Sequence, residues 1–277
     1  MAEKYRSRIN RGVMEISSIN IYTLKSSGQQ TLEQTEVIPD GLRYDRKWIL
    51  VDRNKRAITA REHPKLMKVV ATQVEDQLQV RFADEEKLFA RNKENEIAIG
   101  LFKETVGGVA VSEEADDWFS SLLGIPCQLL FQAPNLQREV LSRRGGKPGD
   151  IVNYADEAPI LLLGESALNH LNSLLATPIS MRHFRPNLVF SGGEPHTEDH
   201  WKLIEIGNCR FEVIQACQRC IMTTINPDSL EKDSKQEPLR SLAGYRSSPG
   251  GGVVFGVHLI PRKLGKIRLG DSIRVIQ

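Results

Sequence analysis

Residues 216–227 read Ala216-Cys217-Gln218-Arg219-Cys220-Ile221-Met222-Thr223-Thr224-Ile225-Asn226-Pro227. They place two thiols, a guanidinium and two hydroxyls in what we expect to be a short turn between apolar strands. Reactive groups gathered in this way predict a functional site rather than a segment of the core. The β-rich sequence around the stretch predicts the scaffold that carries it.

The two cysteines of this stretch leave several interpretations open. Cys217 and Cys220 have the C-x-x-C spacing of a redox pair or of half a zinc site, and the spacing also arises by chance. A zinc site needs about four ligands, and the sequence has no second C-x-x-C pair. A thioredoxin-like pair precedes a helix, whereas 221–225 is predicted to be extended. Cys220 is then either a thiolate ligand for a sulfur-binding metal, with Arg219 attracting an anion, or a small buried hydrophobe.

The wider sequence predicts a mostly β (α+β) fold. Short β-type segments separated by turns are typical of a barrel or sandwich. We expect strands at 16–22, 48–51, 67–74, 78–82, 127–131, 187–190, 201–206, 210–214, 252–257 and 271–276. Helices are expected at 113–123, with Ser112 as N-cap and Gly124 as C-cap, at 165–175, and briefly around 238–245.

Residues 134–150 interrupt this pattern with a loop-like stretch rich in glycine and basic residues, a linker or a mobile rim loop. We therefore predict two domains, 15–150 and 151–277. The glycine-rich run 249–256 lacks the motif of a phosphate-binding loop and is better interpreted as a turn before a strand.

The length, composition and net charge of the chain limit the classes of function that it can have. The chain has 277 residues, of which 40% are hydrophobic and 26% charged, which is an ordinary globular composition. Its net charge of +2 argues against nucleic acid as a partner. Met1–Met14 has no apolar run of the length of a signal peptide or membrane span, so we expect a cytoplasmic protein that does not bind membranes. The four cysteines are expected to remain thiols there.

Three further motifs place cations at expected ends of strands. They are Lys25-Ser26, Asp45-Arg46-Lys47-Trp48 and Arg185-Pro186-Asn187. An ammonium with a hydroxyl suits a phosphate, and a guanidinium binds anions through two donors. The simpler alternatives are a charged surface turn around Arg46, with Trp48 packing in the core, and an ordinary strand entrance at Arg185.

Together with Gln218-Arg219-Cys220, these motifs resemble those of the MOSC family of molybdenum-cofactor proteins, in the same order along the chain. The pattern is similar to the mitochondrial amidoxime-reducing components and their bacterial relatives. The resemblance implies an N-terminal MOSC-associated β-barrel domain followed by a MOSC β-barrel domain with a few helices. Thr59-Ala60-Arg61 is also similar to the family, without an assigned role.

The resemblance implies roles for individual residues. Cys220 would be the catalytic residue and the ligand of molybdenum. The residues that would bind the molybdenum cofactor (Mo-molybdopterin) are Lys25, Ser26, Arg46, Arg185, Asn187, Gln218 and Arg219. Two positions depart from the family pattern: Gln218 stands where serine is common, and Thr23-Leu24 replace Pro-Val before Lys25. Pyridoxal phosphate is not expected.

The implied activity is that of an oxidoreductase that removes the oxygen atom from N-hydroxylated compounds: amidoximes, hydroxylamines and N-hydroxylated bases. The chain lacks the C-x4-C-x2-C spacing of a plant-type iron–sulfur cluster, so electrons would come from a separate ferredoxin-, flavodoxin- or cytochrome-like protein. Two alternatives remain. One is a non-catalytic molybdopterin carrier or a sulfur-transfer protein with a persulfide on Cys220, and the other is a plain β-barrel binding module.

Overall fold

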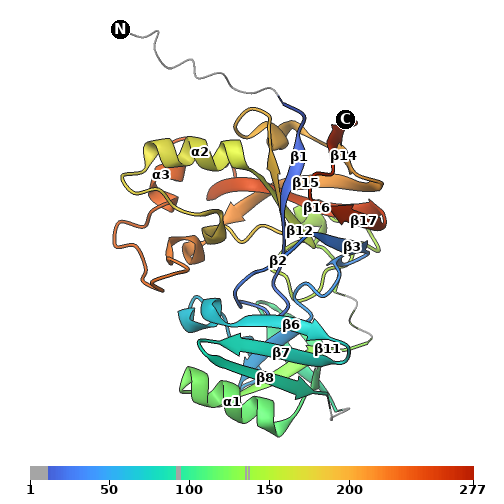
Figure 1. The fold of residues 1–277 in the computed structure, drawn as a ribbon, viewed down its shortest axis with the longest axis vertical. Coiled ribbons are helices and arrows are strands. Elements are labelled where there is room, and N and C mark those ends of the chain that lie inside the picture. Colours follow the sequence, from blue (N-terminus) through green and yellow to red (C-terminus); the bar gives the residue numbers. More distant parts are fainter. Residues whose placement is uncertain (1–11, 92–94, 135, 137) are drawn as a thin grey trace.

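The computed structural model describes residues 12–91, 95–134, 136 and 138–277. Figure 1 shows an upper part, built mainly from the second half of the chain, stacked on a lower part from the first half. Both parts consist mainly of strands, so the prediction of a mostly β fold is confirmed.

The upper part is built on an eight-stranded sheet that curls into half a barrel. Its neighbouring strands are antiparallel, except that β12 and β13 run parallel. In spatial order the strands are β18 (Ile273–Val275), β14 (Leu203–Ile206), β15 (Cys209–Arg219), β16 (Val253–Lys263), β12 (Ile160–Gly164), β13 (Leu188–Ser191), β1 (Glu15–Ile21) and β2 (Gln30–Leu32). A three-stranded sheet pairs the two ends of the chain: β17 (Gly265–Arg268), β3 (Gln34–Ile38) and β4 (Gly41–Leu42).

The lower part holds two further sheets and the first helix. One sheet has the order β5 (Trp48–Asp52), β11 (Cys127–Gln132), β10 (Glu104–Ala110) and β9 (Glu96–Leu101). The other has the order β6 (Val70–Val74), β7 (Gln77–Phe82) and β8 (Glu85–Ala90). The first strands of the chain thus pair with strands of its second half, and the strands of the lower part begin only after Leu42, although Leu24 in the loop after β1 already packs in the lower core. The division near residue 150 stays a prediction.

Three α-helices and five short 3-10 helices complete the described residues. They are α1 (Glu113–Leu123), α2 (Glu165–Leu174), α3 (Leu239–Ala243), η1 (Pro64–Lys68), η2 (Ser142–Arg144), η3 (Met181–His183), η4 (Thr197–His200) and η5 (Ile221–Thr224). The predicted ends of α1 are confirmed: the Ser112 side chain accepts a hydrogen bond from the Ala115 N–H at 3.2 Å, and Gly124 ends the helix with a φ of 69°. Ala115 and Phe119 face the core.

Three sequence expectations are wrong in detail. Residues 221–224 form η5 rather than an extended segment. The expected turn around Cys217 is instead the end of β15, which continues to Arg219 because it pairs with β16 as far as Val253. The strand expected from Met67 begins only at Val70, since Pro64 opens a 3-10 turn that buries Leu66 and Met67.

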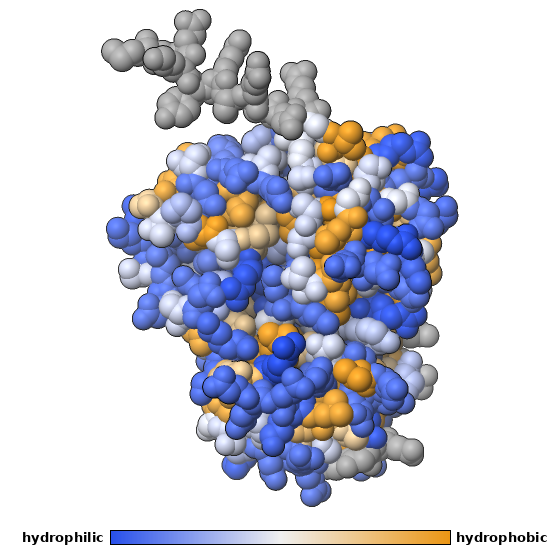
Figure 2. Space-filling model, viewed as in Figure 1, coloured by the Kyte–Doolittle hydropathy of each residue, from blue (hydrophilic) through white to orange (hydrophobic). Residues whose placement is uncertain are grey.

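The distribution of polar and apolar side chains over the surface is the one expected from the overall composition. On the face shown in Figure 2, hydrophilic side chains predominate and hydrophobic ones form scattered patches. No described helix is both long enough and apolar enough to cross a membrane. The expectation about a signal peptide concerns Met1–Met14, of which residues 1–11 lie outside the described residues.

A buried carboxyl group in the upper part predicts a pH-dependent stability. Glu198 in η4 is 0% exposed, and one of its oxygens accepts a hydrogen bond from the Gly164 N–H at 3.3 Å. Burial raises the pKa of Glu198 to about 7. The folded state therefore holds this proton more tightly than the unfolded state, and the resulting stability is complete at low pH and declines as the pH rises from about 4.5 to about 7.

We expect Glu198→Gln to abolish this decline of folding stability with rising pH. The free energy of unfolding of the variant relative to wild type should increase by at most about 3 kcal/mol between pH 4.5 and pH 7.5. Urea unfolding of both proteins across this range measures the difference, in which the contributions of other titrating groups largely cancel. A difference that does not change with pH would contradict the prediction.

Candidate functional site

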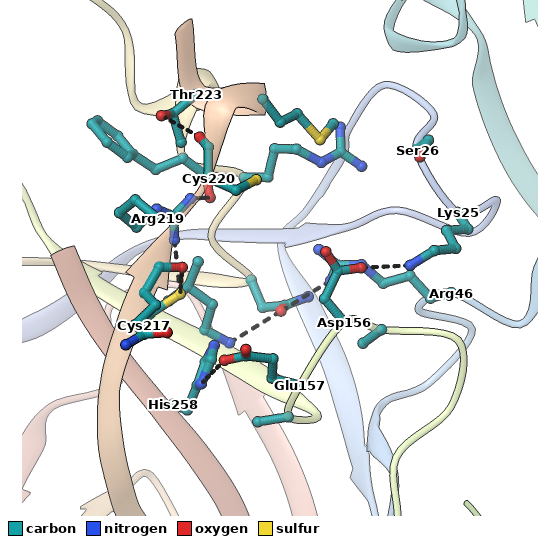
Figure 3. Close-up of a pocket in the computed structure, with 18 of the residues that line it drawn as sticks. Lys25, Ser26, Arg46, Asp156, Glu157, Cys217, Arg219, Cys220, Thr223 and His258 are labelled. Atoms are coloured by element: carbon teal, nitrogen blue, oxygen red, sulfur yellow. Dashed lines mark hydrogen bonds and ion pairs between the residues drawn. The ribbon is translucent and has the colours of Figure 1, made fainter. Parts of the chain in front are cut away.

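The predicted site residues lie around one cavity. Lys25, Ser26, Arg46, Arg185, Asn187, Gln218, Arg219 and Cys220 all line it, as Figure 3 shows for several of them. They come from loops after β1, β4 and η3 and from the end of β15, which are far apart in the sequence. The fold therefore brings together the four motifs that were singled out separately.

Cys220 stands where β15 passes into η5. Its backbone is extended, with φ −120° and ψ 173°, and its carbonyl accepts hydrogen bonds from the Thr223 N–H at 3.0 Å and the Thr223 hydroxyl at 2.9 Å. The Cys220 side chain is exposed and lines the cavity, whereas Cys217 is 6% exposed. Both are free thiols. The accessible sulfur is thus the one in the predicted ligand position.

Arg219 is anchored beneath this thiol. Its guanidinium donates to the Cys217 sulfur at 2.9 Å and to the Phe184 carbonyl at 2.7 Å, and it lies 5.3 Å from the centre of the Phe184 ring. Burial raises the pKa of Cys217, an effect that Arg219 opposes. The Nε of Arg219 is buried without a hydrogen-bond partner. This N–H is therefore an unsatisfied buried donor.

Two arginines enclose an aromatic ring on the opposite wall. The guanidinium carbons of Arg46 and Arg185 lie 4.4 Å and 4.1 Å from the centre of the Tyr22 ring. The Tyr22 hydroxyl donates to the Pro186 carbonyl at 3.2 Å, and burial raises its pKa to about 12. Tyr22 is therefore a neutral platform that holds both cations at the cavity.

Asp45 and Asn187 fix Arg46 from behind. Asp45 is 0% exposed and accepts hydrogen bonds from the Arg46 guanidinium at 2.6 Å and from the Tyr22 N–H at 2.8 Å. The Asn187 side-chain oxygen accepts from Arg46 at 3.1 Å and from the Leu161 N–H at 3.2 Å, while its amide donates to the Asn20 carbonyl at 3.2 Å. Within the described residues, Asn187 is a structural clamp between strands.

Lys25 faces a carboxylate that sequence reasoning missed. Its ammonium donates to Asp156 at 2.5 Å and to the Tyr154 carbonyl at 2.8 Å. Burial raises the pKa of Asp156, but Lys25 and Arg61 outweigh this effect and hold it well below its ordinary value. Asp156 therefore stays ionised. The acidic pair Asp156-Glu157, shortly before β12, was the available signal in the sequence.

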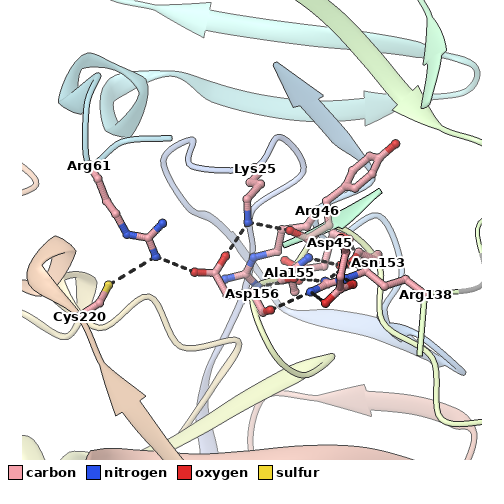
Figure 4. Close-up of polar contacts among 11 residues, drawn as sticks. Lys25, Asp45, Arg46, Arg61, Arg138, Asn153, Ala155, Asp156 and Cys220 are labelled. Atoms are coloured by element: carbon pink, nitrogen blue, oxygen red, sulfur yellow. Dashed lines mark hydrogen bonds and ion pairs between the residues drawn. The ribbon is translucent and has the colours of Figure 1, made fainter. Parts of the chain in front are cut away.

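Arg138 holds the loop that carries Asp156. Its guanidinium donates to the carbonyls of Asn153 at 3.0 Å, Ala155 at 2.5 Å and Asp156 at 3.0 Å (Figure 4). Asn153 in turn donates to the Asp45 carbonyl at 2.7 Å. The loop that carries Asp156 and the Arg46 turn are thus tied together through buried hydrogen bonds.

Glu157 and His258 line a further part of the cavity wall and were also missed. The Nδ1 of His258 lies 4.0 Å from Glu157, which pairs with Arg144 at 2.5 Å. Burial lowers the pKa of His258 to about 4, so its imidazole is neutral at pH 7. Gln218 donates to the Gly251 carbonyl at 3.2 Å and accepts from Arg144 at 3.2 Å. Its side chain therefore ties the cavity rim to neighbouring loops.

Three of the predicted residues have an unfavourable backbone conformation. Ser26, Arg46 and Arg185 have φ values of 71°, 46° and 55°, and they are three of the eleven non-glycine residues with positive φ among the described residues. This conformation is unfavourable for residues with a side chain and tends to occur at ligand-binding sites. Local structure has thus been adapted to aim these side chains at the cavity.

The charges of the cavity suit an anionic ligand. The cations that line it outnumber the carboxylates: they are Lys25, Arg46, Arg61, Arg185 and Arg219, against Asp156 and Glu157. Among the described residues, no carboxylate pairs with Arg185 or Arg219. Burial lowers the pKa of Arg185 to about 10, and the neighbouring Arg46 cation adds to this effect. An anion at this position would supply the missing charge.

The same residues fit a cofactor with a phosphate and a metal better than they fit zinc alone. Among the described residues, no three His, Cys, Asp or Glu side chains gather as a metal site. His196 and His200 are four residues apart, but neither lines the cavity. A single accessible thiol beside arginine donors instead suits a metal whose other ligands come with a cofactor.

Comparisons with known proteins agree with this geometry. The family model of the MOSC domain matches residues 149–274, and that of the MOSC N-terminal beta barrel domain matches residues 13–126. Mitochondrial amidoxime-reducing component 1 of Mus musculus is 30% identical, over 99% of this chain and 86% of that protein. The Homo sapiens protein of the same name is 29% identical, over 98% of this chain and 86% of its own length.

A molybdenum cofactor sulfurase of Solanum lycopersicum is 31% identical over 88% of this chain, which spans only 33% of that protein. The two family models follow one another along the chain and together match most of it. The predicted family is therefore confirmed: this chain belongs to the MOSC family, with a MOSC N-terminal beta barrel domain followed by a MOSC domain.

Proposed function

We propose that this protein is a molybdenum-cofactor-dependent oxidoreductase that reduces N-hydroxylated compounds such as amidoximes, hydroxylamines and N-hydroxylated bases. The observation that supports it most is the pairing of an accessible thiol, Cys220, with arginines that lack a carboxylate partner among the described residues, around one cavity. Similarity to amidoxime-reducing components over nearly the whole chain supports the same reaction.

In this proposal the cavity residues divide into anchors and a ligand. Lys25, Ser26, Arg46 and Arg185 would bind the phosphate of the cofactor, because a buried cluster of cations gains most from a doubly charged anion. Arg219, Asn187 and Gln218, which line the cavity, would orient the pterin. Cys220 would supply the thiolate ligand of molybdenum.

The reaction is a two-electron reduction in which the N–O bond of the substrate breaks. The N-hydroxylated compound takes up two electrons and two protons, and the products are the corresponding N–H compound and water. When bound, the molybdenum centre would supply the two-electron chemistry, and the protein would fix its geometry and exclude competing ligands. The electrons would come from a separate ferredoxin-, flavodoxin- or cytochrome-like protein.

We also propose a cytoplasmic location, supported by the four free thiols and the absence of a disulfide framework among the described residues.

Cofactor content tests this proposal first. The full chain would be produced in a host that makes molybdenum cofactor, and molybdenum and released-pterin fluorescence would be measured per protein for wild type and Cys220→Ala. Near-stoichiometric metal and pterin in wild type, with the metal lost in the variant, are expected. Turnover of benzamidoxime with a chemical reductant as artificial electron donor should then follow the metal content.

Other outcomes separate the alternatives. Bound metal and pterin without any turnover of N-hydroxylated substrates would contradict the enzyme and favour a cofactor carrier. A cyanide-labile sulfur on Cys220 would favour sulfur transfer. Folded protein with neither metal nor pterin would leave a plain binding module.

A further inference from the structure

Arg61 makes a contact that none of the proposed cofactor anchors makes. Its Nη2 lies 3.6 Å from the Sγ of Cys220 and 3.0 Å from a carboxylate oxygen of Asp156, as Figure 4 shows. This nitrogen of Arg61 thus bridges the thiol that directly follows β15 and a carboxylate of the loop before β12. The Arg61 side chain is 28% exposed and lines the cavity.

The guanidinium of Arg61 is held on two sides. Asp156 pairs with Arg61 and, at 2.5 Å, with buried Lys25, so the carboxylate cannot follow Arg61 away from the cavity without leaving Lys25 unpaired. The Phe102 ring lies beside both cations, with its centre 5.7 Å from the Arg61 guanidinium carbon and 5.1 Å from the Lys25 nitrogen. These contacts restrict the direction in which Arg61 donates.

The backbone of Arg61 is docked on the segment that follows Cys220. The turn at Arg61 is closed by hydrogen bonds from the N–H groups of residues 62 and 63 to the Thr59 carbonyl, at 3.1 Å and 3.0 Å. Ala60 is 0% exposed and packs with Met67 and Ile225 in one apolar cluster. Because Ile225 directly follows η5, this cluster fixes the distance between the Arg61 turn and Cys220.

Resting on the proposed function, we propose that Arg61 is a positioning residue that donates an N–H···S hydrogen bond to the metal-binding thiolate of Cys220 and thereby sets the reduction potential of the molybdenum centre. A hydrogen bond to a ligand sulfur draws negative charge from it, and this favours the more electron-rich, reduced metal. Asp156 orients the Arg61 guanidinium through their ion pair. The N-terminal beta barrel domain thus contributes to tuning the centre as well as to anchoring the cofactor.

Substitution of Arg61 in the cofactor-loaded protein tests this role. Arg61→Gln removes the charge and the fork of donors, and Arg61→Lys keeps the charge but has one compact ammonium where the guanidinium reaches two partners. Arg210→Gln is the matched control, because Arg210 also pairs with a carboxylate, Glu205 at 2.7 Å, but does not line the cavity. The readouts are molybdenum and pterin per protein, the midpoint potential from an EPR-monitored redox titration, and the Mo(V) EPR spectrum.

We expect Arg61→Gln to keep wild-type molybdenum and pterin content, to lower the midpoint potential, to alter the Mo(V) spectrum and to slow turnover about tenfold. Arg61→Lys should lie between wild type and Arg61→Gln, and Arg210→Gln should match wild type. The effect of Asp156→Asn should not add fully to that of Arg61→Gln, because both changes act on the same contact.

Two results would overturn the inference while leaving the proposed function intact. One is an unchanged potential and spectrum in loaded Arg61→Gln protein. The other is loss of pterin in Arg61→Gln, which would make Arg61 a cofactor anchor instead. Failure of wild type and Arg210→Gln alike to bind molybdenum would reject the proposed function itself, and the inference with it.

Discussion

Cys220→Ser is expected to lower turnover of N-hydroxylated substrates by at least about a hundredfold while the protein stays folded. A hydroxyl is a harder and much less acidic ligand than a thiol, so it replaces a thiolate poorly on a sulfur-binding metal. Loss of a residue that merely supports a ligand already costs about 10- to 100-fold, and loss of the ligand should cost more. Because the Cys220 side chain is exposed, its replacement creates no core cavity.

The neighbouring thiol provides the control for this prediction. Cys217→Ser makes the same chemical change three residues away, at a residue that is 6% exposed and whose sulfur accepts a hydrogen bond from Arg219 at 2.9 Å. We expect it to keep molybdenum and to lose less than about tenfold in turnover. Steady-state kinetics normalised to metal content measure both variants. Equal losses in the two variants, or full turnover in Cys220→Ser, would refute the assignment of Cys220 as the ligand.

The second large effect is expected from the buried aspartate behind the cofactor anchors. Asp45→Ala should lower the free energy of unfolding by about 3–5 kcal/mol, because it leaves the Arg46 cation without its partner in a buried environment. Asp45 is 0% exposed and also accepts a hydrogen bond from the Tyr22 N–H, so the variant leaves this buried backbone donor without its partner as well. Pterin content should fall with it, since Arg46 would no longer be aimed at the cavity.

An exposed Asp–Arg ion pair provides the comparison for this effect. Asp228 is 68% exposed and pairs with Arg182 at 2.6 Å. We expect Asp228→Ala to cost less than about 1 kcal/mol, because water screens exposed charges. Chemical denaturation of the two variants beside wild type makes the comparison. An Asp45→Ala variant as stable as Asp228→Ala would show that Arg46 finds compensation elsewhere and that the buried network does not hold it.

The sequence by itself determined the elements with strong local signals. The helix 113–123 could be predicted in full, because its N-cap, apolar stripe and glycine C-cap all act within one turn of the chain. The eight predicted site residues were found in short motifs that resemble a known family, and all of them line one cavity. Chemical type and local spacing are properties of the sequence, so these inferences needed no tertiary structure.

Only the tertiary structure decided how the motifs meet and which partners they have. Asp156 and His258 carry no motif of their own; they matter because folding brings Asp156 to within 2.5 Å of Lys25 and His258 to within 4.0 Å of Glu157. Pairing with β16 likewise extended β15 through the expected turn. Arg61 reaches the Cys220 sulfur across 159 residues of sequence. Contacts between segments so distant in the chain depend on the packing of whole sheets, which no local pattern of residues specifies.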